Sequence, residues 1–126
     1  MTVNRGLFSS CREDYRTPTA IYQRFVPPAF DVSDRHEGTF DALTDPWPEP
    51  WFCNPPYGRE IARWTNRMFG TGVALIPSRT DTRWWHQDIM TRAERIEFIR
   101  GRLHFDGLGP APFPSALAFF IKKESP

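Results

Sequence analysis

The sequence predicts a single α/β domain. Of its 126 residues, 40% are hydrophobic and 15% are aromatic, which is enough for one core. Short apolar runs typical of strands alternate with segments whose apolar residues recur at helical spacing. This alternation favours a mostly parallel central sheet, flanked by helices that connect its strands.

The first third of the chain predicts an arm, a short helix and a strand. Residues 1–13 are polar and without periodicity, so we expect a flexible N-terminal arm before a single domain over 14–126. Thr19–Phe25 follows a proline and carries its apolar residues on one face, which predicts a short amphipathic helix. Residues 29–33 form a β-type run, which we expect to be the first core strand.

The middle third predicts a strand followed directly by a helix. Residues 45–50 are rich in proline and tryptophan and predict an irregular connection into a strand at Trp51–Cys53. Residues 58–70 predict a helix, because apolar residues recur along one face while arginines repeat every four residues on another.

The last third predicts further alternation. In order, we expect a buried strand at 73–77, a helix at 81–93, a strand at 96–99, a short strand at 101–105, a loop at 106–114 and a closing strand at 116–122.

Charge and cysteine content restrict the partners that we expect. The net charge is only +1, but 14 of the 16 basic residues are arginine, and residues 59–102 hold nine arginines against five acids. Such an arginine-rich segment is compatible with binding of nucleic acid, or with a solvated surface of local ion pairs. Cys11 and Cys53 lack metal-ligand spacing, so we expect reduced thiols and no metal. No apolar run reaches the roughly 18–20 residues of a membrane span, and residues 1–20 do not resemble a secretory signal. We therefore expect a cytoplasmic protein without a membrane partner.

Asn54-Pro55-Pro56-Tyr57 stands directly after the apolar run Trp51–Cys53. An amide side chain, a carbonyl held rigid by two prolines and an aromatic ring thus lie at the expected end of a strand, where open α/β sheets bind ligands. These residues resemble the amino-methyltransferase signature of S-adenosylmethionine-dependent enzymes that methylate the exocyclic amine of adenine. With its surroundings, the chain is similar to phage-type DNA N6-adenine methyltransferases.

This resemblance implies a site-specific enzyme that transfers a methyl group from S-adenosylmethionine to the N6 amine of a flipped adenine in DNA. The N6 lone pair is delocalised into the ring, and acceptors aimed at its two hydrogens would localise it. The Asn54 side-chain oxygen and the Pro55 carbonyl are the expected acceptors, and Tyr57 would stack on the flipped base. The expected catalytic residues are Asn54, Pro55, Pro56 and Tyr57.

Two further elements resemble the cofactor site of the same family. Residues 15–18 are similar to an upstream Thr-Pro element preceded by an aromatic residue, although a plain helix start has the same pattern. Residues 40–43 are similar to an acidic element that precedes the central motif and contacts the cofactor's adenine. The expected cofactor-binding residues are Tyr15, Thr17, Pro18, Asp31, Ser33, Asp41, Ala42 and Asn54.

Three downstream blocks, 76–86, 98–105 and 111–116, resemble the remaining segments of the phage family in the same order. With the upstream elements they cover most of residues 14–121. They supply candidates for DNA contact, for which surface ion pairs are the alternative. These candidates are Arg59, Arg79, Asp81, Arg83, His86, Arg100 and Arg102.

The chain also departs from the family. The glycine or small-residue loop expected after the first strand is absent, and only ten positions separate Asp31 from Asp41. A crossover between parallel strands needs a dozen residues or more. We therefore expect a reduced Rossmann-like S-adenosylmethionine-dependent methyltransferase fold that lacks one strand–helix unit.

This departure leaves other functions open. The alternatives are a catalytically inactive methyltransferase-like protein that binds nucleic acid, or a methyltransferase that acts on RNA adenine or on a protein glutamine.

Overall fold

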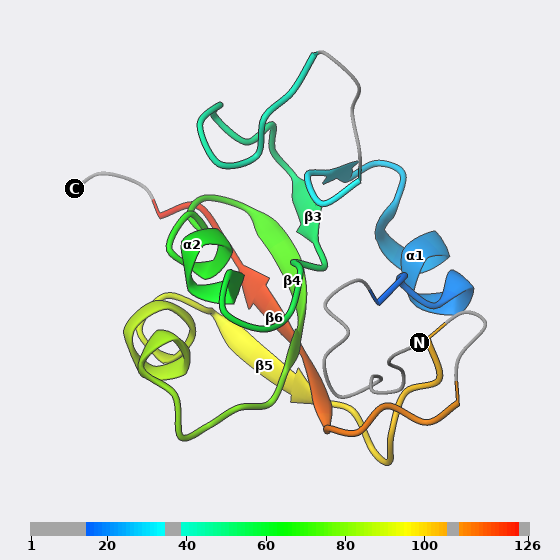
Figure 1. Ribbon diagram of the computed structural model, residues 1–126. Helices are drawn as coiled ribbons and strands as arrows, with labels where there is room; N and C mark the ends of the chain where they lie inside the picture. Colours follow the sequence, from blue (N-terminus) through cyan, green and yellow to red (C-terminus); the bar gives the residue numbers. More distant parts are fainter. Residues whose placement is uncertain (1–14, 35–38, 106–108, 124–126) are drawn as a thin grey trace, which may run out of the picture.

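A computed structural model describes residues 15–34, 39–105 and 109–123. The strands in this part of the chain form one sheet in the order β2-β3-β4-β6-β5 (Figure 1). Their bounds are Phe30–Asp31 for β2, Trp51–Cys53 for β3, Gly72–Pro77 for β4, Arg95–Phe98 for β5 and Ser115–Phe120 for β6. The expected arm at 1–13 lies outside the described residues.

The sheet is mixed, with two parallel and two antiparallel strand pairings among the described strands. β3 pairs in parallel with both β2 and β4, whereas β6 pairs antiparallel with both β4 and β5. It follows that β2, β3, β4 and β5 all point the same way and only β6 is reversed among the described strands. The α/β class is confirmed.

The helices are shorter than expected except for the first. α1 spans Thr19–Phe25, as predicted, and begins after Pro18, whose carbonyl accepts from the Ile21 and Tyr22 amides. α2 covers only Ile61–Thr65 of the expected 58–70. The chain then tightens into three-residue turns, because the Met68 amide donates to the Thr65 carbonyl.

The helix expected at 81–93 is a π-helix, η2, over Trp85–Met90. Its winding turns Trp85, Asp88 and Ile89 toward the interior together. The expected strand at 101–105 is reduced to one isolated bridge between His104 and Pro110.

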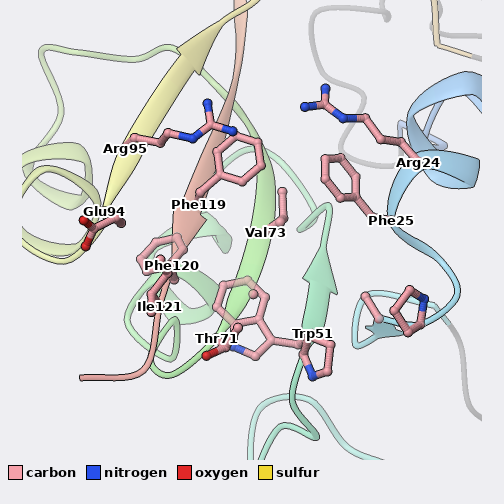
Figure 2. A pocket seen from close by; sticks show the side chains of 14 residues that line it. Arg24, Phe25, Trp51, Thr71, Val73, Glu94, Arg95, Phe119, Phe120 and Ile121 are labelled. Atoms are coloured by element: carbon pink, nitrogen blue, oxygen red, sulfur yellow. The ribbon is translucent and has the colours of Figure 1, made fainter. Parts of the chain in front are cut away.

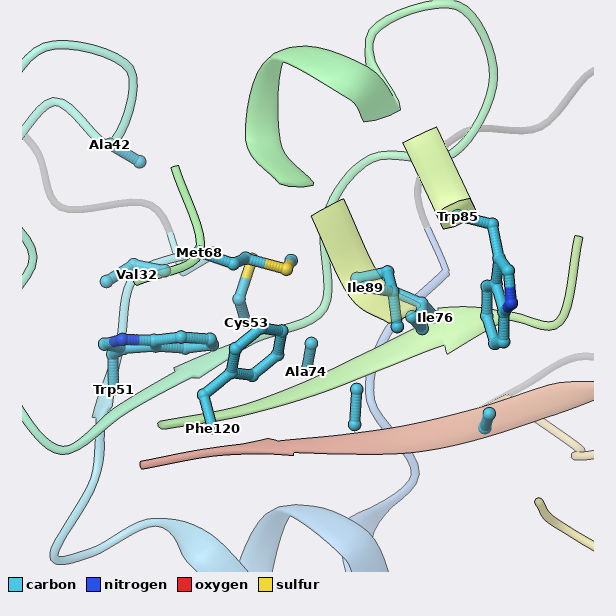
Figure 3. Packing of buried hydrophobic residues seen from close by; sticks show 12 residues of the cluster. Val32, Ala42, Trp51, Cys53, Met68, Ala74, Ile76, Trp85, Ile89 and Phe120 are labelled. Atoms are coloured by element: carbon cyan, nitrogen blue, oxygen red, sulfur yellow. The ribbon is translucent and has the colours of Figure 1, made fainter. Parts of the chain in front are cut away.

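The two faces of the sheet carry separate cores. α2 and η2 cover one face, where Trp51, Cys53, Ile76 and Phe120 are buried (Figure 3). α1 lies on the opposite face. The second core contains, among others, Tyr15, Phe52, Tyr57, Leu75, Phe105, Phe113 and Leu117.

Trp51 is held firmly in the first core, the one covered by α2 and η2. Its indole is fully buried, donates to the Phe69 carbonyl at 2.7 Å and lies over Gly72 on the neighbouring strand. A Cβ atom at position 72 would collide with the ring, which explains why β4 begins with glycine.

The connection from β2 to β3 contains no helix or strand within residues 39–50. The described part of this connection is built from local turns: the Asp41 carboxylate accepts from the Leu43 amide at 2.9 Å, and the Asp41 amide donates to the Asp45 carboxylate at 2.8 Å. β2 pairs only with β3 and so lies at one edge of the described sheet, with β5 at the other. None of the helices in the described ranges is long and apolar enough to traverse a lipid bilayer.

Candidate functional site

The common direction of four strands gathers the predicted site residues at one edge of the sheet. We call the edge at which β2, β3, β4 and β5 end the carboxyl edge, and the edge at which they begin the amino edge. Ser33, Asn54, Ser78 and Arg100 each follow one of these strands within two residues. In open α/β sheets ligands bind at the carboxyl edge.

Ser33 connects the ends of β2 and β3. Its hydroxyl donates to Asp31 Oδ1 at 2.5 Å and accepts from the Asn54 amide nitrogen at 3.0 Å. The Ser33 amide donates to the same carboxylate oxygen at 2.9 Å. The position of the Asn54 backbone is thereby tied to the Asp31 carboxylate.

The side-chain amide of Asn54 is held from the segment that precedes α1. Its Nδ2 donates to the Tyr15 carbonyl at 2.6 Å and to Thr17 Oγ1 at 3.1 Å. A backbone carbonyl can only accept, so the nitrogen must face Tyr15 and the oxygen must face away.

Asn54 Oδ1 consequently has no donor in the described part of the chain. It is buried and has no hydrogen-bond partner among the described residues. A buried acceptor without a partner costs about 1–3 kcal/mol, so a ligand that donates a hydrogen to it would recover this energy. Because the oxygen is buried, an N–H donor would reach it only where the groups that cover it move aside.

The rest of the motif is more enclosed than expected. Pro55 is buried, and Tyr57 is only 5% exposed. The Tyr57 ring packs 5.4 Å from Tyr15 and 5.2 Å from Phe113, measured between ring centroids, and its hydroxyl donates to the Leu75 carbonyl at 3.3 Å. Burial raises the pKa of the Tyr57 hydroxyl well above its ordinary value. Stacking of Tyr57 on a base would therefore require a neighbouring ring to move.

Asp31 is the acidic group nearest to Asn54 in this hydrogen-bond network. Burial raises its pKa above the ordinary value, opposed by the hydrogen bonds from Ser33, while the nearby Asp34 carboxylate also raises it. A half-buried carboxylate of this kind can accept from an ammonium or a hydroxyl group.

Asp41 and Ala42 are not joined to this network. Asp41 is exposed and closes its own turn, and Ala42 is buried in the first core, where its carbonyl accepts from Trp47 Nε1 at 2.8 Å. No hydrogen bond described for residues 39–50 connects either residue to Asn54 or Asp31.

The candidates for DNA contact are all exposed and follow strands that end at the carboxyl edge. They are Arg59, Arg79, Asp81, Arg83, His86, Arg100 and Arg102. None of these arginines joins an ion pair among the described residues.

Three of the candidates have other partners. Arg102 donates to the Ala111 carbonyl at 3.4 Å, and the guanidinium of Arg79 lies 5.9 Å from the centre of the Phe113 ring. His86 Nε2 lies 2.7 Å from the Thr80 carbonyl. Because a carbonyl only accepts, that nitrogen carries the hydrogen.

Two buried hydroxyls were not singled out from the sequence. Ser78 follows β4, Ser115 begins β6, and neither Oγ has a hydrogen-bond partner in the described ranges. The available signal was weak: each is a small polar residue beside an apolar strand.

A pocket of about 340 Å³ lies at the amino edge, away from Asn54. Phe25, Val73 and Phe119 line it, and the side chains of Arg24 and Arg95 run along one side (Figure 2). The sequence did not predict this pocket, and its apolar lining carries none of the predicted site residues.

Comparison of the chain with protein-family models, with curated proteins and with solved structures yields no significant match.

Proposed function

We propose that this protein is an S-adenosylmethionine-dependent methyltransferase that acts on the N6 amine of adenine in DNA. The observation that carries the proposal is the buried, partnerless Oδ1 of Asn54 at the end of β3. An exocyclic amine has two hydrogens to donate, and an oriented acceptor at this point can take one of them.

The topology supports a reduced Rossmann-like methyltransferase fold. β2, β3 and β4 form a parallel unit whose strands end at the edge that carries Asn54. Nucleotide-containing cofactors of Rossmann-like folds bind at such an edge. The described connection from β2 to β3 lacks a further helix or strand, which agrees with the loss of one strand–helix unit.

The residues around Asn54 fit such a cofactor in part. Asp31 offers a half-buried carboxylate suited to an ammonium or a ribose hydroxyl, and Tyr15 and Thr17 hold the Asn54 side-chain amide. Ser33 holds Asp31 and the Asn54 backbone together. Asp41 and Ala42 have no described hydrogen bond to this group of residues.

The chemistry that we propose needs little from the protein beyond positioning. When bound, S-adenosylmethionine would supply the methyl group to the N6 amine and would leave as S-adenosylhomocysteine, and the N6 proton would pass to water. Asn54 Oδ1 and the Pro55 carbonyl would accept the N6 hydrogens and favour a localised lone pair. No general base with a tuned pKa is required.

The unpaired arginines of the carboxyl edge support DNA as the substrate. Guanidinium groups match phosphate oxygens, and these arginines have no carboxylate partner in the described part of the chain. They follow strands that end at the edge at which a flipped adenine would reach Asn54.

A second function is a nucleic-acid-binding protein without methyl transfer. The observation that favours it is the connection from β2 to β3, whose described residues 39–50 contain no helix or strand. This protein would keep the exposed arginines and lack a complete cofactor site.

The test combines calorimetric titration with S-adenosylmethionine and transfer of a tritiated methyl group to unmethylated DNA. We expect binding and label in N6-methyladenine, with activity reduced by about 10²-fold or more in Asn54→Ala. Asn66→Ala, which changes an exposed asparagine at the end of α2, is the matched control and should remain active. Retained turnover in Asn54→Ala would refute the role of Asn54. Binding of DNA without binding of cofactor or transfer of label would favour the inactive protein.

A further inference from the structure

The Asn54 side chain has acceptors for both of its donor hydrogens, whereas its acceptor oxygen has no donor among the described residues. Nδ2 has two hydrogens, and the Tyr15 carbonyl and Thr17 Oγ1 accept one each. Oδ1 has two lone pairs and no described partner. Both donors are thus used to hold the amide, and only the acceptor remains for a ligand.

The two partners of Nδ2 have different effects on the amide. The torsion that rotates a side-chain amide is broad and roughly two-fold, so one contact leaves the plane of the amide poorly defined. The Tyr15 carbonyl excludes the flipped orientation, because it would then face an oxygen. The Thr17 hydroxyl supplies the second point that defines the plane.

We propose that Thr17 is a positioning residue that acts through Asn54, keeping Oδ1 pointed at the acceptor amine. The role rests on the proposed function for its catalytic consequence, but the clamp itself is a property of the folded chain. Thr17 is 37 positions from Asn54 and precedes the motif by two strands, so the inference follows from the tertiary contact and not from the motif.

This role differs from that of a residue that simply binds the cofactor. A cofactor contact would change the affinity for cofactor when it is removed, whereas a positioning residue would change the rate of transfer. A misplacement of a reacting group by about 1 Å can cost about 10²-fold in rate. The two roles are therefore separable by measuring kcat and affinity in the same variants.

The first measurement is independent of activity. The side-chain NH₂ signals of Asn54 are assigned by NMR as the pair missing from Asn54→Ala, and their hydrogen exchange is followed in variants of position 17. Thr17→Val should accelerate this exchange about tenfold or more, because it removes the hydroxyl that accepts one of the two hydrogens. Thr17→Ser should retain the slow exchange of the unchanged protein. Thr44→Val, at an exposed turn residue, is the control and should have no effect. Equal exchange in Thr17→Val and in the unchanged protein would overturn the clamp.

The second measurement is enzymatic. Thr17→Val should lower kcat for DNA methylation about 10–100-fold, with less than about threefold change in the dissociation constant of S-adenosylhomocysteine, and Thr17→Ser should restore kcat. An unchanged kcat, or a loss of cofactor affinity that accounts for the whole effect, would overturn the positioning role. Thermal unfolding of each variant verifies that it is folded.

Failure of the proposed function gives a different result. If the unchanged protein transfers no methyl group, the proposed activity is refuted. The exchange measurement still decides whether Thr17 holds the Asn54 amide.

Discussion

The arginines at the two edges of the sheet are in opposite situations. At the amino edge, Arg92 pairs with the buried Asp88 at 3.1 Å, and Arg67 donates to the Leu43 and Asp45 carbonyls at 3.0 and 2.5 Å. At the carboxyl edge, the arginines that are candidates for DNA contact have no carboxylate partner among the described residues. Arg79 and Arg100 are two of them.

The arginines of one small domain can therefore have two different roles. Arginines whose donors are used internally tie elements together. Arg92, for example, also reaches the Thr65, Asn66 and Met68 carbonyls and so joins η2 to the end of α2. Arginines left in water instead create a positive field that an anion can enter. The partner of each guanidinium, and not its exposure alone, separates the two groups.

Arg92→Gln should have the largest effect on stability and little effect on DNA binding. Loss of Arg92 leaves the Asp88 carboxylate, which is 4% exposed, without its cation, so the free energy of unfolding should fall by about 3 kcal/mol. Urea denaturation measures this change. Arg63→Gln, which breaks the exposed pair with Glu60 at 2.7 Å, is the control and should cost less than about 1 kcal/mol. Similar losses in the two variants would remove the distinction between them.

The double variant Arg79→Gln and Arg100→Gln should show the reverse pattern. Each arginine that contacts a phosphate contributes through counterion release, so affinity for DNA at low salt should fall about tenfold and the salt dependence should become shallower. The free energy of unfolding should change by less than about 0.5 kcal/mol, because neither side chain has an ion-pair partner among the described residues. Fluorescence anisotropy with a labelled duplex tests the affinity, and an unchanged salt dependence would exclude these two residues from the DNA surface.

Asp31→Asn should remove a pH dependence at the carboxyl edge. Burial raises the pKa of Asp31 above its ordinary value of 3.8, so the folded protein binds more protons than the unfolded chain between these two pKa values. The contribution of Asp31 to the free energy of unfolding therefore falls as pH rises through that window and stays lower above it. The substitution should abolish this fall and raise stability at neutral pH relative to the unchanged protein, while cofactor binding weakens. Urea denaturation at several pH values across the acidic range measures this change. If the free energy of unfolding depends on pH identically in the variant and the unchanged protein, the raised pKa of Asp31 is contradicted.

Glu97→Gln should have the smallest effect, although two arginines share this carboxylate at the amino edge. Arg24 and Arg95 lie 3.1 and 3.5 Å from its oxygens, and the hydrogen bond from Arg24 lowers the pKa of Glu97. All three side chains are well exposed, so the free energy of unfolding should fall by no more than about 1 kcal/mol. A loss as large as that of Arg92→Gln would show that pairing matters more than burial here.

Several local expectations match the structure well. The helix at Thr19–Phe25 and the strand at Trp51–Cys53 have the predicted bounds, because proline and an apolar run mark them over short distances. The helix expected at 58–70 was too long, since its periodicity continues through residues that form tight turns. The hydrogen bonds by which Arg67 holds the 43–45 turn could not be read from that periodicity.

The candidate site was predicted unevenly. Asn54, Asp31, Ser33 and Thr17 were named separately and prove to be joined by hydrogen bonds. Asp41 is predicted from its place before the motif, but in the structure its Oδ1 accepts from the Leu43 amide within its own turn. An acidic residue in a loop carries no local signal of which partner it will find.

Neighbouring residues alone specified the helix at Thr19–Phe25, the strand at Trp51–Cys53, the proline-held motif after it and the concentration of arginine in 59–102. Only the tertiary structure decided that β6 inserts in reverse between β4 and β5, and that the Asn54 amide meets Tyr15 and Thr17 across 39 and 37 positions. It also decided which arginines are paired and which remain in water. These outcomes depend on which distant groups packing brings within hydrogen-bond range, and no local pattern specifies that.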